Sequence, residues 1–293
     1  MDKSTTTTLI NGVAADFLSV NDRSIHYGDG LFETILCEQN KLLYWQQHYQ
    51  RLKQSAARLK LICPDEVLLL NDIKKIMQGY DNSINNIYAV KIIVTRGVSE
   101  RGYQFSNKIS PTRIVVSSLL DKAYSSLVAG KLFAGNLYVC KQQASINESL
   151  AGLKHLNRLE NVLARNEWQD RVADNIIDGL MLDANQQVIE GSMSNVFIVR
   201  DKKLITPNLK YSGVDGIVRQ LILDVAKRNN LATLVSDLTV DDFNCADECF
   251  ITNSLIGMKL VTGLAEHKYK SSSITDLLFK ELLKTKIEHA KVI

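Results

Sequence analysis

Two runs rich in β-branched residues, at positions 87–94 and 113–119, most constrain how the first third of this chain can fold. Valine, isoleucine and threonine favour extended backbone, so we expect these runs to form two neighbouring strands. The same third also contains helical periodicity and turn signals. The further elements expected there are a strand and turn at 9–12, a polar loop at 22–30 that leads into an apolar run at 31–36, and helices at 48–61 and 64–76.

The length of 293 residues is sufficient for two hydrophobic cores, because single cores usually stop growing at about this size. We place a small domain at residues 1–120, a linker at 121–130 and a larger domain at 131–293. The elements expected in the second domain are a strand at 131–141, a hairpin at 180–190, strands at 195–199 and 249–252, a helix after Gly216, and a terminal helix capped by Ser273 with Asp276.

Composition narrows the class of protein. Apolar residues make up 45% of the chain and charged residues 23%, which is ordinary for a soluble globular protein. The formal net charge of +3 is small and the basic residues are dispersed, so we expect no nucleic-acid partner. Such a charge suits a small anionic substrate.

The cysteines and the start of the chain indicate in which cellular compartment the protein is expected. Five scattered cysteines, with no CxxC pair and no histidine cluster nearby, argue against a disulfide framework and a zinc site, so we expect no metal. The start of the chain has no apolar signal-peptide core, and no apolar run reaches bilayer length. We therefore expect a cytoplasmic protein without a membrane partner. The cysteines are Cys37, Cys63, Cys140, Cys245 and Cys249.

The stretch at 152–165 places Lys154 just before an amphipathic pattern. Apolar residues recur there at three- and four-residue steps, which predicts a helix from Leu156 that buries one stripe. Lys154 at the entry of this helix is either a solvated residue or an amine held for Schiff-base chemistry. Spacing alone leaves both open. The stripe consists of Leu156, Leu159, Val162 and Leu163.

Three other features are compatible with a phosphorylated aldehyde cofactor. Glu190 is expected at a strand end, Gly216 precedes a helix whose N–H groups can receive an anion, and Arg51 lies on a helix. Each has a commoner interpretation, as a surface glutamate, a turn glycine and a solvated arginine. Only together with Lys154 do they indicate a cofactor site.

Several motifs resemble the class IV pyridoxal-phosphate enzymes, which comprise branched-chain aminotransferases, D-amino acid aminotransferases and aminodeoxychorismate lyases. The run at 154–159 and the loop at 101–103 look most like the lyases. The resemblance implies a fold-type IV α+β protein, with a small N-terminal domain and a C-terminal domain built on a barrel-like sheet with surrounding helices. It also implies a homodimer and a pyridoxal 5'-phosphate cofactor. The motifs lie at 22–33, 101–103, 152–159, 190–197, 213–219 and 252–255.

The same resemblance assigns roles residue by residue. It makes Lys154 the catalytic Schiff-base lysine and Glu190 the partner of the pyridine nitrogen. The other residues that it assigns to the cofactor are Arg51, Ser194, Asn195, Gly216, Ile217, Val218 and Ser254. The residues that it assigns to the substrate are Arg101, Tyr103, Phe32, Thr34 and Asn253.

Three departures from the family pattern bear on the reaction or on phosphate binding. Many aminotransferases of this family carry a tyrosine where this chain has Leu159, and lyase-type members have leucine there. Phe32 replaces a tyrosine of the D-amino acid aminotransferases and so lacks the hydroxyl. Val218 replaces a more usual threonine, which leaves phosphate binding more dependent on backbone N–H groups.

We therefore expect an aminodeoxychorismate lyase that eliminates pyruvate to form 4-aminobenzoate for folate biosynthesis. The alternative of the same fold is a D-amino acid or branched-chain aminotransferase, which needs the same lysine and glutamate. An alternative of another class is a binding protein that has kept the scaffold without the cofactor.

Overall fold

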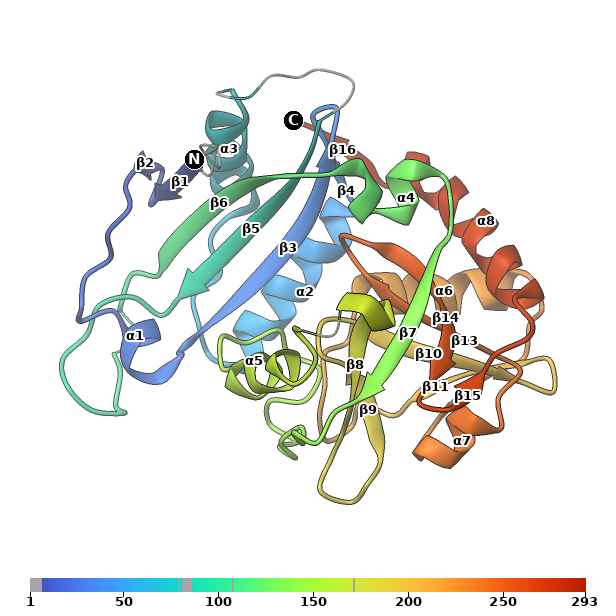
Figure 1. Ribbon diagram of the computed structural model, residues 1–293. Helices are drawn as coiled ribbons and strands as arrows, with labels where there is room; N and C mark the ends of the chain where they lie inside the picture. The colour runs from blue at the N-terminus through green and yellow to red at the C-terminus, as the bar shows by residue number, and fades with distance from the viewer. Residues whose placement is uncertain (1–6, 79, 81–85, 107, 171) are drawn as a thin grey trace. The chain divides into compact units, whose positions relative to one another are not determined.

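The computed structural model describes residues 7–78, 80, 86–106, 108–170 and 172–293 (Figure 1). Two compact units emerge from the contacts within the chain. Unit 1 comprises Met1–Tyr124, Lys154–Asn157 and His289–Ile293, and unit 2 comprises Ser125–Leu153 and Arg158–Glu288. The units differ from the expected domains because 154–157 and the C-terminal residues join unit 1. The first six residues, on which the expectation of a missing signal peptide rests, lie outside the description.

Unit 1 contains an antiparallel sheet of seven described strands. The runs expected to form neighbouring strands do so as β5 and β6, in register from Ile87↔Leu120 to Thr95↔Thr112. The C-terminal strand β16 joins this sheet by pairing with β4. In the order β16-β4-β3-β5-β6-β1-β2, the strands are Ala290–Val292, Lys41–Leu43, Gly30–Glu38, Ile87–Thr95, Thr112–Leu120, Thr7–Ile10 and Val13–Ala14.

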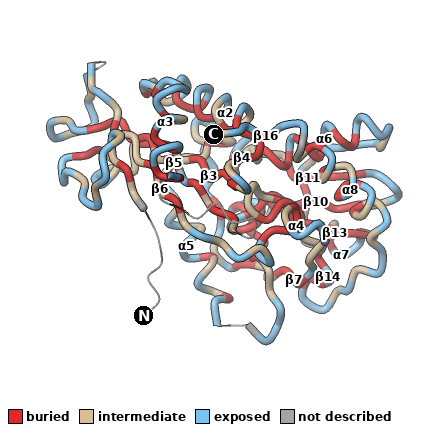
Figure 2. The backbone as a smooth tube through the Cα atoms, turned by 90° about the horizontal axis from the view of Figure 1, so that it is seen from above, coloured by how far each residue is buried: buried red, intermediate tan, exposed pale blue. Residues whose placement is uncertain are grey.

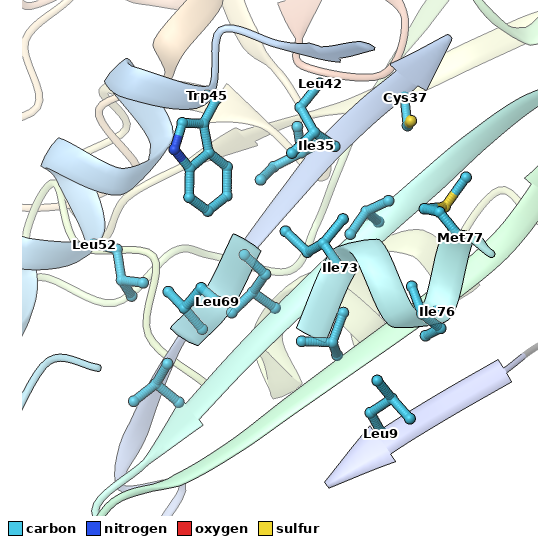
Figure 3. Close-up of a cluster of buried hydrophobic side chains, with 14 of the residues drawn as sticks. Leu9, Ile35, Cys37, Leu42, Trp45, Leu52, Leu69, Ile73, Ile76 and Met77 are labelled. Carbon is cyan, nitrogen blue, oxygen red and sulfur yellow. The ribbon is translucent and has the colours of Figure 1, made fainter. Parts of the chain in front are cut away.

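Helices α2 (Trp45–Arg58) and α3 (Glu66–Met77) pack against this sheet, α2 on β3 and α3 on β6 and β1. Their apolar faces form the core of unit 1 with side chains of β1 and β3, and Figure 3 shows Trp45 and Leu69 within it. In Figure 2 the buried residues follow β3 and β5. Asp65 caps α3 by accepting from the Val67 N–H, which confirms the predicted start of that helix.

A short helix, α1 (Arg23–Tyr27), occupies part of the segment expected to be a loop. The Asp22 carboxylate accepts from the Ser24 N–H at its start, and Gly28 ends it in the left-handed conformation at φ 60°. The prediction of a loop was therefore wrong for these five residues, because capping signals at both ends stabilise a single turn. A 3-10 turn, η1 (Lys122–Tyr124), follows β6.

Unit 2 contains a nine-stranded mixed sheet. Its path runs β12-β11-β10-β13-β14-β7-β8-β9, and β15 pairs with β14. The sheet curls, because β9 at one end of this path also contacts β10 and β11. The expected barrel-like sheet is thus confirmed. From β7 to β15 the strands are Phe133–Val139, Ile176–Leu182, Val188–Gly191, Asn195–Arg200, Lys203–Pro207, Thr233–Ser236, Glu248–Asn253, Gly257–Leu264 and His267–Lys268.

The helices of unit 2 include α6, which begins directly after Gly216 as predicted. Helices α6 and α8 pack on each other and on β13. None of the described helices combines the length and apolar character that crossing a bilayer requires. The helical segments are α4 (Ser126–Ala129), α5 (Leu159–Asn166), η2 (Val172–Asp174), α6 (Ile217–Arg228), α7 (Val240–Asn244) and α8 (Ser273–Glu288).

The apolar stripe after Lys154 is not buried as predicted. Helix α5 begins only at Leu159, and the side chains of Leu159 and Val162 are 71% and 62% exposed. The helix instead packs through Ala164, which lies in a cluster with Trp168 and Met181. The predicted start at Leu156 was wrong, because Lys154 and Leu156 instead make backbone hydrogen bonds with Phe32 and Gly30.

The start of α8 is stabilised differently from the prediction. The buried Glu248 carboxylate accepts from the Ile274 N–H at 3.0 Å and the Thr275 N–H at 2.8 Å. The Ser273 hydroxyl also donates to Glu248, while Ser272 donates to Asp276. The predicted pairing of Ser273 with Asp276 was wrong, because a strand residue distant in sequence supplies the cap.

Replacing this cap should destabilise the protein. Glu248→Gln loses the charge that accepts two helix N–H groups, and we expect the free energy of unfolding to fall by about 2 kcal/mol. Urea denaturation at neutral pH measures the change. Glu281→Gln, which removes only the exposed pair with Lys284, is the control and should change it by less than about 0.5 kcal/mol. Equal effects of the two variants would contradict the assignment.

Candidate active site

Lys154 lies in a short extended segment that pairs with β3. The Phe32 N–H donates to the Lys154 carbonyl at 2.9 Å, and the Leu156 N–H donates to the Gly30 carbonyl at 3.0 Å. Between them, Leu31 and His155 form an antiparallel bridge. The start of β3 can pair with residues 154–156 because β4 pairs with β3 only at the other end of the strand, at Cys37 and Glu38. Lys154 is therefore positioned by a β-bridge and two backbone hydrogen bonds to β3 and not, as predicted, by a helix entry.

The amine of Lys154 lies over the ring of Phe32. Its Nζ is 4.3 Å from the ring centroid, and the residue is partly buried. Gly30 permits this arrangement, since a Cβ there would meet the Val94 carbonyl at 2.6 Å and Leu156 at 2.8 Å. Thr34, two residues along β3 from Phe32, is also partly exposed. Strand alternation places Phe32 and Thr34 on the same face.

The opposite face of β3 carries a buried carboxylate, Glu33. Arg51 donates to it through Nε at 2.8 Å and Nη2 at 2.6 Å, and His48 Nδ1 lies 2.6 Å from it. Burial raises the pKa of Glu33, but the Arg51 charge and the hydrogen bonds from His48 and Arg51 bring it down to about 2. Burial also lowers the pKa of His48, despite Glu33. The orientation of the Arg51 guanidinium is thus fixed by an ionised carboxylate.

In unit 2, Glu190 lies near the end of β9 with its carboxylate buried. Its Oε2 accepts from the Val214 N–H at 2.8 Å and from the Asn195 amide at 3.3 Å. The Asn195 amide also donates to the Val214 carbonyl at 2.8 Å. The Glu190 carboxylate near the end of β9 is therefore held by β10 and by the loop before α6.

The start of α6 has no side-chain cap, and Gly216 is its N-cap residue. Ile217 and Val218 supply its first N–H groups, where the helix dipole favours an anion. A Cβ at Gly216 would collide with Asn195 Oδ1, so glycine is required for this close approach. The buried Arg219 follows and donates to Asp215 at 3.0 Å. Burial lowers the pKa of Arg219, while Asp215 and Glu190 oppose this shift.

The turn between β9 and β10 is built on Asp178, a buried carboxylate of β8. The hydroxyls of Ser192 and Ser194 donate to it at 2.6 and 2.5 Å, and the Met193 N–H donates at 3.2 Å. Burial raises the pKa of Asp178 despite these hydrogen bonds. Ser194, which was assigned to the cofactor, thus also braces the turn between Glu190 and Asn195.

The turn after β13 is closed by Asn253. Its Oδ1 accepts from the N–H groups of Leu255 at 2.9 Å and Ile256 at 2.8 Å, and its amide donates to the Met193 carbonyl. Ser254 lies in the same turn and is partly exposed. The turn is therefore tied to the β9–β10 segment within unit 2.

Arg101 and Tyr103 lie on an exposed loop of unit 1, and the Tyr103 side chain is 84% exposed. The ring of Tyr103 lies 5.3 Å from that of Tyr27. The predicted site residues thus fall into three groups: Lys154, Phe32, Thr34 and Arg51 around β3, Arg101 and Tyr103 on this loop, and Glu190, Ser194, Asn195, Gly216, Ile217, Val218, Asn253 and Ser254 in unit 2.

Sequence reasoning missed the residues that hold these groups in place. Strand and helix periodicity indicates the faces on which Glu33 and His48 lie. Their contact could be predicted only if the packing of the two elements were already known. In the sequence, Asp178 is a lone acidic residue in an apolar strand, and nothing further there indicated that it holds a turn. The motif containing Arg219 was noted, but the burial of its side chain was not expected.

Residues 30–264 match the family described as amino-transferase class IV. The chain belongs to this family. The resemblance inferred from the motifs and the expected fold-type IV architecture are thereby confirmed. Enzymes of this class depend on pyridoxal phosphate.

Individual relatives include both lyases and aminotransferases. The chain is 32% identical over 261 residues to an aminodeoxychorismate lyase of Vibrio harveyi, covering 89% of this chain and 92% of the relative. It is 29% identical over 251 residues to a D-alanine aminotransferase of Listeria monocytogenes, covering 84% and 82%. The crystal structure of 4-amino-4-deoxychorismate lyase from Pseudomonas aeruginosa superposes with a TM-score of 0.83 at 34% identity, covering 94% and 98%.

The buried ion pair of Glu33 with Arg51 predicts how the free energies of unfolding of wild type and Glu33→Gln differ with pH. Glu33→Gln breaks a buried ion pair, so at pH 7 we expect the free energy of unfolding to fall by about 3 kcal/mol. The pKa of Glu33 is about 2 in the folded chain, against an ordinary value of 4.5 for an exposed glutamate in the unfolded chain. The carboxylate therefore stabilises the fold above pH 4.5, and this contribution is lost as pH falls toward 2.

Denaturant unfolding of wild type and Glu33→Gln between pH 3 and 8 tests this expectation. The difference between the two proteins should be constant above about pH 5 and shrink below it. Glu100→Gln, at an exposed glutamate, is the matched control. A difference independent of pH down to 3 would show that the carboxylate does not act as an ionised partner of Arg51.

Proposed function

We propose that the protein is a pyridoxal-phosphate-dependent 4-amino-4-deoxychorismate lyase that eliminates pyruvate to form 4-aminobenzoate for folate biosynthesis. The observation that carries this proposal is the likeness to two lyases, at 32% and 34% identity over about nine tenths of the chain. The D-alanine aminotransferase is less similar over a shorter stretch.

The residues of the chain fit the chemistry of this cofactor. The first N–H groups of α6, those of Ile217 and Val218, have no side-chain cap and suit a phosphate. A Cβ at Gly216 would collide with Asn195 Oδ1, so glycine is needed where the chain enters the helix. The buried Glu190 carboxylate is oriented by two donors and suits a protonated ring nitrogen. Lys154 supplies the amine. The further residues proposed to hold the cofactor are Arg51, Ser194, Asn195 and Ser254.

The bound cofactor supplies an electron sink for the carbon from which a proton is removed. Lys154 removes that proton from the amine-bearing ring carbon of the substrate and must be neutral to do so. Glu190 keeps a proton on the ring nitrogen. Loss of enolpyruvate leaves an aromatic ring, so the elimination is strongly downhill.

The substrate carries two carboxylates, which require cationic partners. We assign one of them to Arg101, because a guanidinium forks onto a carboxylate in a bidentate manner. Tyr103 lies on the same exposed loop. Phe32 and Thr34 would line the Lys154 face of β3. Asn253, in the turn after β13, is the further residue assigned to the substrate. These assignments rest on the family resemblance.

The second candidate is a D-amino acid aminotransferase, which is favoured by the 29% identity to the D-alanine enzyme. Such an enzyme uses the same lysine and glutamate, so their geometry does not separate the two activities. Leu159 and Phe32 favour the lyase, because aminotransferases of the family often carry tyrosines at these positions. The homodimer and the cytoplasmic location stay predictions.

A product assay separates the two activities. The protein loaded with pyridoxal phosphate is incubated with aminodeoxychorismate, and we expect 4-aminobenzoate and pyruvate to form in equal amounts. Parallel reactions with D-alanine or a branched-chain amino acid and a keto acid should give only slow transfer. Steady keto acid formation from D-alanine, without 4-aminobenzoate, would overturn the lyase assignment in favour of the aminotransferase.

Mass spectrometry identifies the lysine that carries the cofactor. Borohydride treatment of the loaded wild type should add one cofactor-derived group to the chain, and Lys154→Ala should abolish this addition. Lys91→Ala is the control, because the Lys91 amine also lies over Phe32, at 4.9 Å from its centroid, and should retain the addition. A wild type that acquires no group would favour the binding protein without a cofactor.

A further inference from the structure

The loop that carries Arg101 and Tyr103 accepts several hydrogen bonds from one buried side chain, that of Arg23. One terminal nitrogen, Nη1, donates to the Gly102 carbonyl at 2.9 Å and to the Ser99 hydroxyl at 3.1 Å. The other, Nη2, donates to the Tyr103 carbonyl at 3.1 Å. A longer contact of 3.4 Å joins Nη1 to the Gln104 carbonyl. A single guanidinium thus engages three consecutive backbone carbonyls.

Arg23 is itself fixed from the other side. Its Nε donates to Asp29 at 2.8 Å, and Arg96 donates to the same carboxylate at 2.7 and 3.0 Å. Burial raises the pKa of Asp29, but hydrogen bonds from Arg96 and Arg23 hold it below its usual range. The N–H of Arg23 also donates to the Gly97 carbonyl. The carboxylate that orients Arg23 is therefore ionised, and both ends of Arg23 are held.

The loop has a second anchor in Tyr27. The Gly102 N–H donates to the Tyr27 hydroxyl at 3.1 Å, so both backbone polar groups of Gly102 are engaged. Gly102 adopts φ +108°, where a glycine is favoured. The guanidinium of Arg23 lies 4.8 Å from the Tyr27 ring centroid. Arg101 lies between Ser99 and Gly102, which both accept hydrogen bonds from Arg23. The side chain of Arg101 itself is exposed.

We propose that Arg23 is a positioning residue for substrate recognition. It sets the backbone at 99–104 so that Arg101 presents its guanidinium to a carboxylate of the substrate. The proposal rests on the lyase function and on the role of Arg101 proposed above. An arginine is required because a lysine has one compact donor group and does not reach three carbonyls and Asp29 together.

Steady-state kinetics of Arg23→Lys test this role. We expect KM for aminodeoxychorismate to rise about tenfold while kcat changes less than about twofold, because the anchor and not the proton transfer is displaced. Arg113→Lys is the matched control. It changes another arginine of unit 1, whose Nε donates to Asp72 at 2.6 Å instead of to Asp29 or the loop, so KM should stay near the wild-type value.

A double-mutant cycle separates positioning from general loss of structure. Arg101→Gln alone should raise KM, and adding Arg23→Lys to it should raise KM little further, because the group being positioned is already absent. Additive effects of the two substitutions would overturn the proposal. So would a fall in kcat as large as the rise in KM in Arg23→Lys.

Trypsin cleavage provides a readout that does not depend on activity. The bond after Arg101 lies within the segment that Arg23 holds, so Arg23→Lys should be cut there several-fold faster than wild type, and Arg113→Lys should not. Thermal unfolding of both variants verifies that each remains folded. Equal cleavage rates in all three proteins would overturn the proposal even if the wild type forms 4-aminobenzoate. A wild type without lyase activity would instead overturn the proposed function, and the cleavage rates would still decide whether Arg23 sets the loop.

Discussion

The backbone pairing of residues 154–156 with the start of β3 is the interaction on which the arrangement of unit 1 depends. It fixes the backbone of Lys154, whose Nζ lies over the Phe32 ring. The next residue of the strand, Glu33, points to the other face and orients Arg51. One strand therefore sets the positions of both the proposed catalytic amine and the proposed phosphate-binding cation, and a slip of one residue would exchange the two faces.

Unit 2 is organised around the consecutive strands β9 and β10. Asp178 holds the turn between them, Glu190 lies near the end of one strand and Asn195 begins the next. The segment before α6 joins this group through the Val214 N–H, and the Gly152 N–H donates to the Gly213 carbonyl beside it. The buried Glu190 carboxylate and the segment that leads into α6 are thus joined by hydrogen bonds within unit 2, which supports the roles proposed for them at a ring nitrogen and a phosphate.

The sequence predicted those elements whose signals are local. The paired runs that became β5 and β6, the hairpin of β8 and β9, and the helix after Gly216 all follow from residue preference or a turn. Helical periodicity showed that Leu159 and Val162 share a face, but it does not report whether that face is covered, and both proved exposed. The partners of Arg51, Arg23 and the α8 start could not be predicted, because Glu33, Asp29 and Glu248 become their partners only through folding.

We propose that Lys154, Glu190 and the start of α6 serve one pyridoxal phosphate. A crystal structure of the protein with this cofactor tests the proposal. We expect the phosphate on the Ile217 and Val218 N–H groups, the ring nitrogen facing Glu190, and Lys154 bonded to the carbonyl carbon. A phosphate bound away from α6, or a cofactor attached to another lysine, would contradict it.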